Sequence, residues 1–504
     1  MTELTGTPEL AVSSRRRRTI FIVTALGAFM ASLDLSIVNV AFPALERAFS
    51  HDTRATLSWV ITGYSIIFGS LLVVAGRTAD RIGSRRVFFF GLGVFCLGSL
   101  LCGVAPSVEA LIIGRVIQGA GAAAVLPSSL GLLLTSYSKE QRSQVVALWG
   151  GIGALAVATG PSLGAVLITA FSWRAAFYVN LPVGLIAWLV GRRVLAKTNG
   201  SGSTSSPDYP GVVLLSASLA LLVLAISEGP SWGWSNARII GGFVLAVLLF
   251  STFLFRSARH QEPVLDLRLF RSRSFSVANT MALLYSMGFF AMLLGNILFL
   301  TSVWHYSILR AGLAITPGPL VVAVVSGPAG KLAGRYGFRR VLLVGFCVFT
   351  LGLLWYVWRV GLTPHYLSLW LPGTLTVGLG IGLTFPVISA AAVSSLEPAR
   401  YSVGSAVNQT ARQIGGALGV AILVVILGTP TSAVQALHNF HHLWTYVAVM
   451  SASAGVVAIL LGKAKKTAPS LASNELAVDE AKGMEEMLDG EIALGSLERD
   501  DNSH

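Results

Sequence analysis

Residues 76–86 read GRTADRIGSRR, and residues 330–340 read GKLAGRYGFRR. The two segments match at six of eleven positions and lie 254 residues apart. In a second pair of segments, Gly-X-Gly is followed by Pro eight residues after the first Gly; this pair comprises Gly119–Pro127 and Gly378–Pro386, which lie 259 residues apart. Repetition at half the length of the chain indicates a fold built from two related halves.

Composition places the repeat in a membrane. Hydrophobic residues make up 54% of the 504 residues and charged residues 12%, whereas soluble proteins carry about 25% charge. Mean hydropathy is +0.72. The apolar residues fall in runs of about 18–27, the length that crosses roughly 30 Å of hydrocarbon as a helix, and a β-barrel would show short alternating segments instead. Fourteen spans are predicted, at roughly 19–43, 57–75, 87–104, 110–134, 144–170, 177–193, 211–227, 237–255, 275–301, 311–333, 341–358, 367–392, 404–427 and 442–462.

The orientation follows from the basic residues between spans. Alternate loops hold 26 Lys and Arg on one side and six on the other. Because cytoplasmic loops are enriched in Lys and Arg, both termini are predicted to be cytoplasmic. Residues 15–18 are all Arg, but the apolar run that follows is about 25 residues long, so it is predicted to be a retained span of the cell inner (cytoplasmic) membrane, not a cleaved signal.

The predicted fold is therefore an all-α polytopic membrane protein, with two six-helix pseudo-repeat halves and two inserted central helices. Two parallel six-helix halves around a central site are a known plan of secondary transporters. A Gly/Ser-rich segment at 198–208 is predicted to be a linker, and the acidic C-terminal tail is predicted to be disordered. The parts are a cytoplasmic tail (1–18), a first half (19–193), a linker with two helices (194–274), a second half (275–463) and the acidic tail (464–504).

One carboxylate stands apart from the other acids. Of 23 Asp and Glu, only Asp34 falls inside a predicted span. Such a residue costs about 2.5–3.5 kcal/mol on insertion scales and usually marks an ion or proton path. Asp34 and Arg115 are predicted to lie about 14 and 8 Å inside the outer ends of their spans, which makes a pair geometrically feasible. The pair is either a proton relay or a permanent structural ion pair, unless Arg115 snorkels outward.

Six segments together resemble the major facilitator superfamily, and more closely its fourteen-span drug:proton antiporter family (multidrug efflux type). The resemblance covers about residues 19–463 and implies that Arg115, in the fourth-span motif, takes part in proton transfer. The fifth-span motif departs from the family pattern at Ala156 and Ala165, and Gly334 replaces the acid in the second copy of the loop motif. The segments are LDLSIVNVAFP (33–43), GRTADRIGSRR (76–86), RVIQGAGAA (115–123), TGPSLGA (159–165), SWRAAFYVNLPVG (172–184) and GSAVNQTARQIGGALG (404–419).

The motifs predict local roles. In the cytoplasmic loop, Gly76 and Gly83 permit a tight turn and close helix approach. Asp80 accepts hydrogen bonds or pairs with Arg, and the basic residues face lipid phosphates or helix C-termini; these are Arg81, Arg85 and Arg86. Pro161 is predicted to kink the fifth span. The Gly pairs of the fifth and thirteenth spans are predicted to form a closely packed seam between the halves; they are Gly160, Gly164, Gly415 and Gly419.

A substrate pocket is the least constrained prediction. Aromatic residues with few polar groups suit an apolar ligand, although aromatic residues of a span commonly face lipid or a neighbouring helix. Arg412 and Gln413 are predicted either to line an inner cavity or to reach the cytoplasmic interface. The other pocket candidates are Tyr64, Tyr285, Phe289, Phe290, Asn296 and Phe385.

Several chemistries are excluded. The GxGxxA pattern from Gly119 lies inside a span, and Lys331 is followed by Leu332, so neither a dinucleotide site nor a phosphate loop is predicted. No cofactor, metal or nucleic-acid partner is expected, and the cysteines suit core positions. Without an ATP site, an ion gradient must supply the energy. The predicted function is that of a monomeric, non-enzymatic antiporter, which exchanges protons for small amphipathic substrates across the lipid bilayer. The alternatives are a dedicated exporter of a metabolite or lipid, a symporter on the same scaffold, a channel, or a membrane-embedded enzyme.

Overall fold

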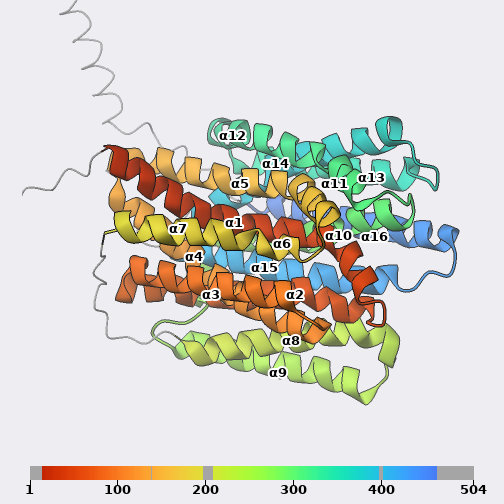
Figure 1. Cartoon of the computed structure of the whole chain (residues 1–504), viewed down its shortest axis with the longest axis horizontal. Coiled ribbons are helices and arrows are strands. Elements are labelled where there is room, and N and C mark those ends of the chain that lie inside the picture. The colour runs from red at the N-terminus through yellow and green to blue at the C-terminus, as the bar shows by residue number, and fades with distance from the viewer. Residues whose placement is uncertain (1–13, 138, 197–207, 395, 397–400, 462–504) are drawn as a thin grey trace, which may run out of the picture. The chain divides into compact units, whose positions relative to one another are not determined.

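The structure is a computed structural model that describes residues 14–137, 139–196, 208–394, 396 and 401–461. Within these ranges the regular structure is helical (Figure 1). Thirteen of the described helices are long and apolar enough to cross a membrane, and the shorter apolar stretch Leu155–Ala170 lies at the end of a further long helix. The prediction of an all-α membrane protein with about fourteen spans is confirmed. The predicted disordered tail and most of the predicted linker lie outside the described residues.

The first half consists of seven helices, because the sixth span is built from a short and a longer helix. The first helix begins within the predicted N-terminal tail, so the four Arg at 15–18 form its first turns. The bounds are α1 (Ser14–Ala48), α2 (Arg54–Ile82), α3 (Ser84–Val104), α4 (Val108–Ser136), α5 (Lys139–Ala170), α6 (Ala175–Tyr178) and α7 (Asn180–Val194).

Two inserted helices, α8 (Tyr209–Trp232) and α9 (Ala237–Arg259), follow and pack against each other. Helix α8 also contacts α2 of the first half and α15 of the second, through an apolar cluster that includes Ile66, Leu215 and Ala417. Helix α9 lies on the outside of this pair (Figure 1). The inserted pair therefore touches both halves.

The second half begins after a short 3₁₀ helix, η1 (Leu267–Arg271). Its tenth and twelfth spans are each composite, since a short helical segment precedes the main helix. The bounds are α10 (Arg273–Ser302), α11 (Ile308–Ile315), α12 (Pro317–Tyr336), α13 (Phe338–Arg359), η2 (Tyr366–Trp370), α14 (Leu371–Val393), α15 (Tyr401–Leu427) and α16 (Ala433–Ile459).

The sequence repeat is also a repeat of backbone conformation. Gly83 ends α2 and precedes α3 with φ +100°, and Gly337 separates α12 from α13 with φ +87°. Each Gly N–H donates to a carbonyl four residues back, that of Ala79 or Ala333. A positive φ favours Gly, which lacks the Cβ that would clash. The predicted tight turn is therefore present in both copies of the loop motif.

The prediction that the Gly pairs of the fifth and thirteenth spans pack between the two halves is wrong, because these glycines contact other helices. A Cβ at Gly160 would lie 2.4 Å from the side chain of Ser36 in α1, and one at Gly419 would lie 2.0 Å from the Met287 carbonyl in α10. These glycines therefore bring helices together within one half, α5 to α1 and α15 to α10. The sequence motif indicates a close approach but does not name the helix that approaches.

Other residues form the contact between the halves. A Cβ at Gly312 of α11 would lie 2.6 Å from the Pro161 carbonyl of α5. Deeper in the bundle, the Thr410 hydroxyl of α15 donates to the Gly69 carbonyl of α2 at 2.7 Å. At these two points the halves meet through small residues and main-chain oxygens, which permit close contact.

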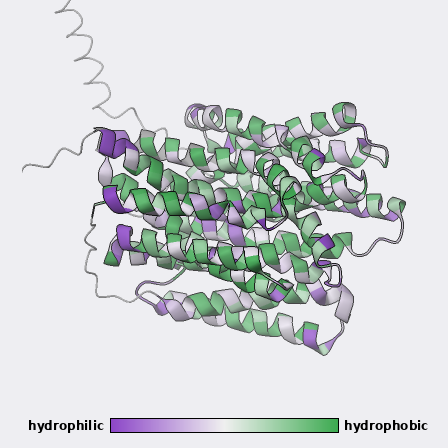
Figure 2. Cartoon of the chain, viewed as in Figure 1, coloured by the Kyte–Doolittle hydropathy of each residue, from purple (hydrophilic) through white to green (hydrophobic). Residues whose placement is uncertain are grey.

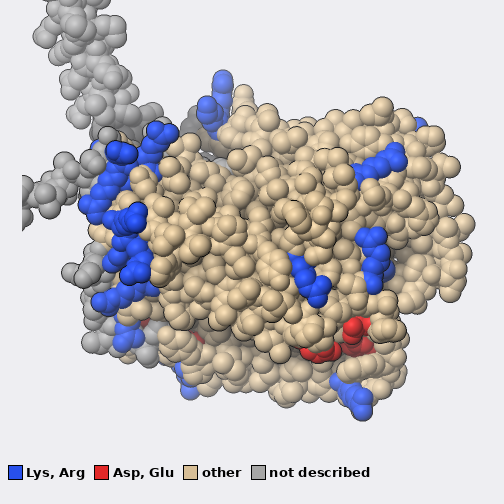
Figure 3. All heavy atoms as spheres, viewed as in Figure 1, with Lys and Arg blue, Asp and Glu red and all other residues tan. Residues whose placement is uncertain are grey.

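Polarity follows the span prediction. Figure 2 shows hydrophobic residues along the lengths of the helices and hydrophilic residues mainly at their ends. On the face drawn in Figure 3, Lys and Arg gather at the end of the bundle where α1 begins and α7 ends. That end corresponds to the side with the larger count of basic residues in the sequence, the predicted cytoplasmic side.

Candidate functional site

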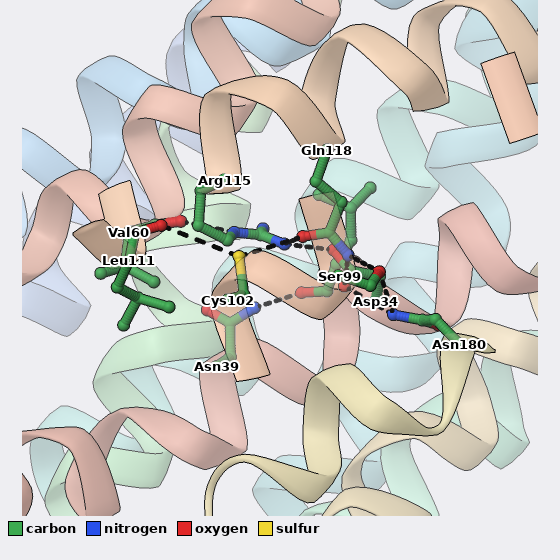
Figure 4. Close-up of polar contacts among 10 residues, drawn as sticks. Asp34, Asn39, Val60, Ser99, Cys102, Leu111, Arg115, Gln118 and Asn180 are labelled. Atoms are coloured by element: carbon green, nitrogen blue, oxygen red, sulfur yellow. Dashed lines mark hydrogen bonds and ion pairs between the residues drawn. The ribbon is translucent and has the colours of Figure 1, made fainter. Parts of the chain in front are cut away.

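A buried cluster of polar side chains lies inside the first half, where four helices meet (Figure 4). Asp34 comes from α1, Ser99 from α3, Arg115 and Gln118 from α4, and Asn180 is the first residue of α7. All five are at most 1% exposed. The cluster is therefore sealed from water in this conformation, in a region that the apolar spans surround.

Its centre is an ion pair. Arg115 Nη1 donates to Asp34 Oδ2 at 2.5 Å. Arg115 Nε donates to the Val60 carbonyl of α2 at 2.8 Å, and the guanidinium carbon lies 4.1 Å from the ring centroid of Tyr64. The pairing of Asp34 with Arg115, which their predicted depths in the two spans made feasible, is confirmed. Because both charges are buried, removing one partner would cost about 3–5 kcal/mol.

Neutral amides complete the coordination of the carboxylate. Asp34 Oδ1 accepts from Gln118 Nε2 at 2.7 Å and from Asn180 Nδ2 at 3.2 Å. Gln118 Oε1 in turn accepts from Arg115 Nη1 at 2.5 Å, and both amides donate to Ser99 Oγ, at 2.8 and 3.3 Å. Every one of these contacts with Asp34 donates a hydrogen bond to it, as an ionised, acceptor-only carboxylate requires.

Local sequence places these groups. Gln118 follows Arg115 by three residues, so both project from one face of α4. A Cβ at Gly98 of α3 would lie 2.5 Å from the main-chain nitrogen of Gln118, and one at Gly119 would lie 2.8 Å from the main-chain carbonyl oxygen of Tyr64 in α2. These glycines let α3 and α2 approach α4 closely, which brings side chains of modest length within hydrogen-bonding distance.

The second half has no matching charges at the positions that the repeat relates to this site. At the offset of 259 residues, Thr374 stands where Arg115 stands, and Val377 stands where Gln118 stands. The Thr374 hydroxyl bonds the Tyr356 hydroxyl at 2.8 Å. One half therefore carries a buried ionic cluster and the other a neutral pair of hydroxyls at the corresponding place.

Most of the predicted pocket aromatics form one cluster in the second half. The ring of Phe289 lies 4.8 Å from that of Phe385 and 5.4 Å from that of Phe290. Tyr285 lies 5.5 Å from Phe385, and the Arg412 guanidinium lies 5.1 Å from the Phe385 ring. The cluster joins α10, α14 and α15 and combines apolar faces with one cation.

Three predicted pocket residues lie elsewhere. Tyr64 belongs to the ionic cluster of the first half, below Arg115. Asn296 Oδ1 accepts from the indole N–H of Trp444 at 3.0 Å, which fixes it against α16. Gln413 is buried against Gly69 of α2, at the contact between the halves.

Arg412 is held by neutral groups. Its Nη1 donates to Ser389 Oγ at 3.2 Å, its Nη2 donates to Gln409 Oε1, and its Nε has no hydrogen-bond partner in the described contacts. A half-buried guanidinium with only neutral partners retains its electrostatic attraction for an electron-rich group.

The loop motif is partly explained. Arg85 Nη2 donates to the Arg192 carbonyl at the end of α7 at 3.2 Å, which matches the predicted contact of a loop cation with a helix C-terminus. Asp80 and Arg86 are exposed and Arg81 is half-buried. A Cβ at Gly76 would meet Pro127 at 3.5 Å, an ordinary contact, so a closer helix approach does not explain this glycine.

Sequence reasoning missed Gln118, Ser99 and Asn180 as parts of the site. Gln118 lies within RVIQGAGAA and Asn180 within SWRAAFYVNLPVG, two of the segments that carried the family resemblance. The spacing from Arg115 to Gln118 was a usable signal, because residues three apart share a helix face. Nothing in the local sequence indicates that Ser99 of α3 faces the same point.

Comparison with known proteins agrees with this architecture. The profile described as Major Facilitator Superfamily matches residues 24–420. The methylenomycin A resistance protein of Streptomyces coelicolor is 32% identical over 444 residues, covering 87% of this chain and 90% of the relative. The multidrug resistance protein Stp of Mycobacterium tuberculosis is 34% identical over 423 residues, covering 83% and 78%.

A solved structure of the nucleoside transporter NupG shares the fold, with a TM-score of 0.61 at 11% identity, over 89% of this chain and 100% of that one. The family match extends over most of the chain, and the structure has the helices that such a protein requires. The chain belongs to the Major Facilitator Superfamily and is a multi-pass membrane transporter.

Proposed function

We propose that the protein is a proton-coupled antiporter, which exports small amphipathic compounds such as drugs or antibiotics across the cytoplasmic membrane by alternating access. The names of its relatives, a methylenomycin A resistance protein and a multidrug resistance protein, support the substrate class. The carboxylate at Asp34, buried with Arg115, is the observation that carries the proton coupling.

Protonation of Asp34 is the step that changes the energetics. The ionised carboxylate holds Arg115 and, through it, the main chain of α2. A proton on Asp34 removes the negative charge and leaves Arg115 as a buried cation without a counter-ion, at about 3–5 kcal/mol. Moving a two-state equilibrium from 1:99 to 99:1 takes about 5.5 kcal/mol. One proton therefore supplies most of a conformational switch.

Asn180 fits both protonation states. Its Nδ2 donates to the ionised Asp34, while its own Oδ1 is buried without a hydrogen-bond partner in the described contacts. Rotation of the amide by 180° presents Oδ1 to the new O–H of a protonated Asp34. The amide thus accepts from the acid in one state and donates to the carboxylate in the other.

The substrate binds, in this proposal, between the halves and against the aromatic cluster of Tyr285, Phe289 and Phe385. Aromatic faces with few polar groups suit compounds of varied shape. Exchange follows because the substrate and the proton are bound in alternation. The substrate is held while Asp34 is ionised, and protonation of Asp34 from the outside favours release of the substrate. The transporter functions as a monomer, since the polar cluster is complete within one chain.

The test is transport in inside-out vesicles with an imposed pH gradient and a panel of dyes and metabolites. Uphill uptake of several amphipathic dyes, with proton movement in the opposite direction, supports the proposal. Uptake of a single metabolite would favour a dedicated exporter, and proton movement in the same direction a symporter. Equilibration without accumulation would favour a channel and contradict the proposal.

A further inference from the structure

A groove opens between the two inserted helices at their predicted cytoplasmic ends. Its volume is about 860 Å³. One end is basic and polar, and the wall that runs into the membrane is apolar. The residues that line it are Tyr209, Pro210, Val213, Leu214, Thr252, Phe255, Arg256, Arg259 and His260.

The basic end of the groove contains one arginine that is paired with a carboxylate and one arginine that is exposed. Arg256 Nε donates to Asp208 Oδ1 at 2.6 Å, and Asp208 is fully buried at the start of α8, so these two charges balance. The Arg259 guanidinium is exposed and lies 3.9 Å from the ring centroid of Phe255. Arg259 therefore contributes a positive charge to the groove that no carboxylate pairs among the described ion pairs.

His260 adds a neutral donor. Its Nδ1 accepts from the Glu262 main-chain N–H at 3.1 Å. Because a main-chain N–H only donates, Nδ1 is the acceptor and Nε2 carries the ring proton of the neutral side chain. Tyr209, 55% exposed at the mouth of the groove, brings a hydroxyl. A guanidinium, an imidazole N–H and a phenol O–H are suitable donors for a phosphate diester.

Acidic residues near the groove lie within the electrostatic reach of a cation of α2. Arg77 interacts electrostatically with Glu262, Asp266 and Asp208. Asp208 is also paired with Arg256. Arg77 and Arg256 offset two of these three carboxylates, and the exposed Arg259 is the cation that the groove itself presents to an anion.

The apolar wall faces the membrane. Val213 is 65% exposed and Phe255 57%, and α9 exposes further hydrophobic side chains, among them Ile240, Val244, Leu248 and Phe250. Helix α9 has 23 residues, about 35 Å at 1.5 Å per residue, slightly more than the roughly 30 Å hydrocarbon thickness. Arg259 at its end therefore lies at headgroup depth, and Val213 lies at acyl-chain depth.

We propose that this groove is a binding site for an anionic phospholipid of the cytoplasmic leaflet. The phosphate accepts from Arg259, His260 and Tyr209, and an acyl chain lies along Val213 and Phe255. Basic pockets between helices on this side of a membrane are suited to anionic headgroups. Helix α8 contacts both α2 and α15, so the lipid binds to the helix pair that touches both halves.

Native mass spectrometry of the delipidated full-length protein tests the site without reference to transport. Phosphatidylglycerol and phosphatidylcholine with identical acyl chains are titrated separately. We expect tighter binding of phosphatidylglycerol, and an approximately five-fold loss of that affinity in Arg259→Gln, from about 1 kcal/mol per basic residue. Arg259→Lys should retain the preference, because it keeps the charge.

Arg238→Gln is the matched control, since it removes an exposed Arg from the opposite end of the same helix. Its phosphatidylglycerol affinity should equal that of the unaltered protein. Equal binding of the two lipids to the unaltered protein would overturn the proposal, as would an equal loss in the two Gln variants. Displacement of the lipid by millimolar inorganic phosphate would also overturn it, because the site would then recognise the free anion. The comparison of the two lipids on the unaltered protein can overturn the proposal even if a variant does not fold.

Discussion

Replacing Asp34 by Asn keeps the size of the side chain and removes its charge, and we expect it to abolish uphill, pH-dependent export. The carboxylate accepts a hydrogen bond from Arg115 at 2.5 Å and two more from Gln118 and Asn180. An amide at this position turns one acceptor into a donor, which then faces other donors. Export driven by a pH gradient requires a group that exchanges a proton, and Asn does not.

The magnitude follows from the buried charge that remains. Arg115 keeps its contacts with the Val60 carbonyl, Gln118 and the Tyr64 ring but loses its counter-ion. Loss of one partner of a buried pair costs about 3–5 kcal/mol. At 1.4 kcal/mol for each factor of ten, the lower figure shifts the population of the sealed conformation by about 150-fold. The variant should therefore also melt at a lower temperature.

A double variant separates a proton carrier from a structural ion pair. Asp34→Asn with Arg115→Gln leaves no buried charge, so much of the lost stability should return, while pH-driven export remains absent. The matched control is Glu46→Gln, which breaks the half-exposed ion pair with Arg54 on the outside of the bundle. That change should cost at most about 1 kcal/mol and leave export intact.

The assay is dye uptake into inside-out vesicles, with protein amount and melting temperature measured for every variant. A folded Asp34→Asn protein that still accumulates dye against its gradient in a pH-dependent manner would refute the reasoning. Restored uphill export in the double variant would refute it equally, since the pair would then have served only to hold helices together.

Three further predictions concern the surroundings of the site and the helix seams. Gln118→Leu should destabilise the protein by about 1–3 kcal/mol, less than Asp34→Asn, because the ion pair survives while a hydrogen-bonding partner is lost. A fall in melting temperature larger than that of Asp34→Asn would argue against this. Gly419→Ala would place a Cβ 2.0 Å from a main-chain oxygen of α10 and should destabilise by about 1–3 kcal/mol. Gly334→Ala, in helix α12 with open space around its Cβ, should instead stabilise by up to about 1 kcal/mol. Equal melting temperatures of the two variants would contradict the packing argument. Pro161→Ala should alter transport and proton leak more than folding, and full activity with unchanged leak would speak against a role for the bend.

The fold was largely predictable because a membrane imposes strong rules on sequence. Helix length is set by bilayer thickness, and orientation by Lys and Arg in the loops. The pairing of Asp34 with Arg115 was accessible for the same reason: depth along a span can be counted residue by residue, and few charges compete as partners. These inferences need no knowledge of which helices are neighbours.

The remainder depends on neighbours and was not predictable. Asn180 is separated from Asp34 by 146 residues, and only the packing of α7 on α1 brings them together. The glycines of α5 show the same limit, since Gly160 indicates a close approach but the helix that approaches is α1, not one from the other half. Rotation about a helix axis and the identity of the facing helix are set by tertiary packing, for which a single sequence carries weak signals.

Helix α2 joins two contacts described separately above. Its Val60 carbonyl receives Arg115, and its Gly69 carbonyl receives Thr410 from the other half. Nine residues of helix separate these points, about 13.5 Å along the axis. A helical segment of that length is stiff, so a displacement of α2 at the ionic cluster also displaces its contact with the opposite half. Under the proposed proton coupling, helix α2 is enough to connect the pair of Asp34 and Arg115 with the half that carries the aromatic cluster, without a relay of flexible side chains.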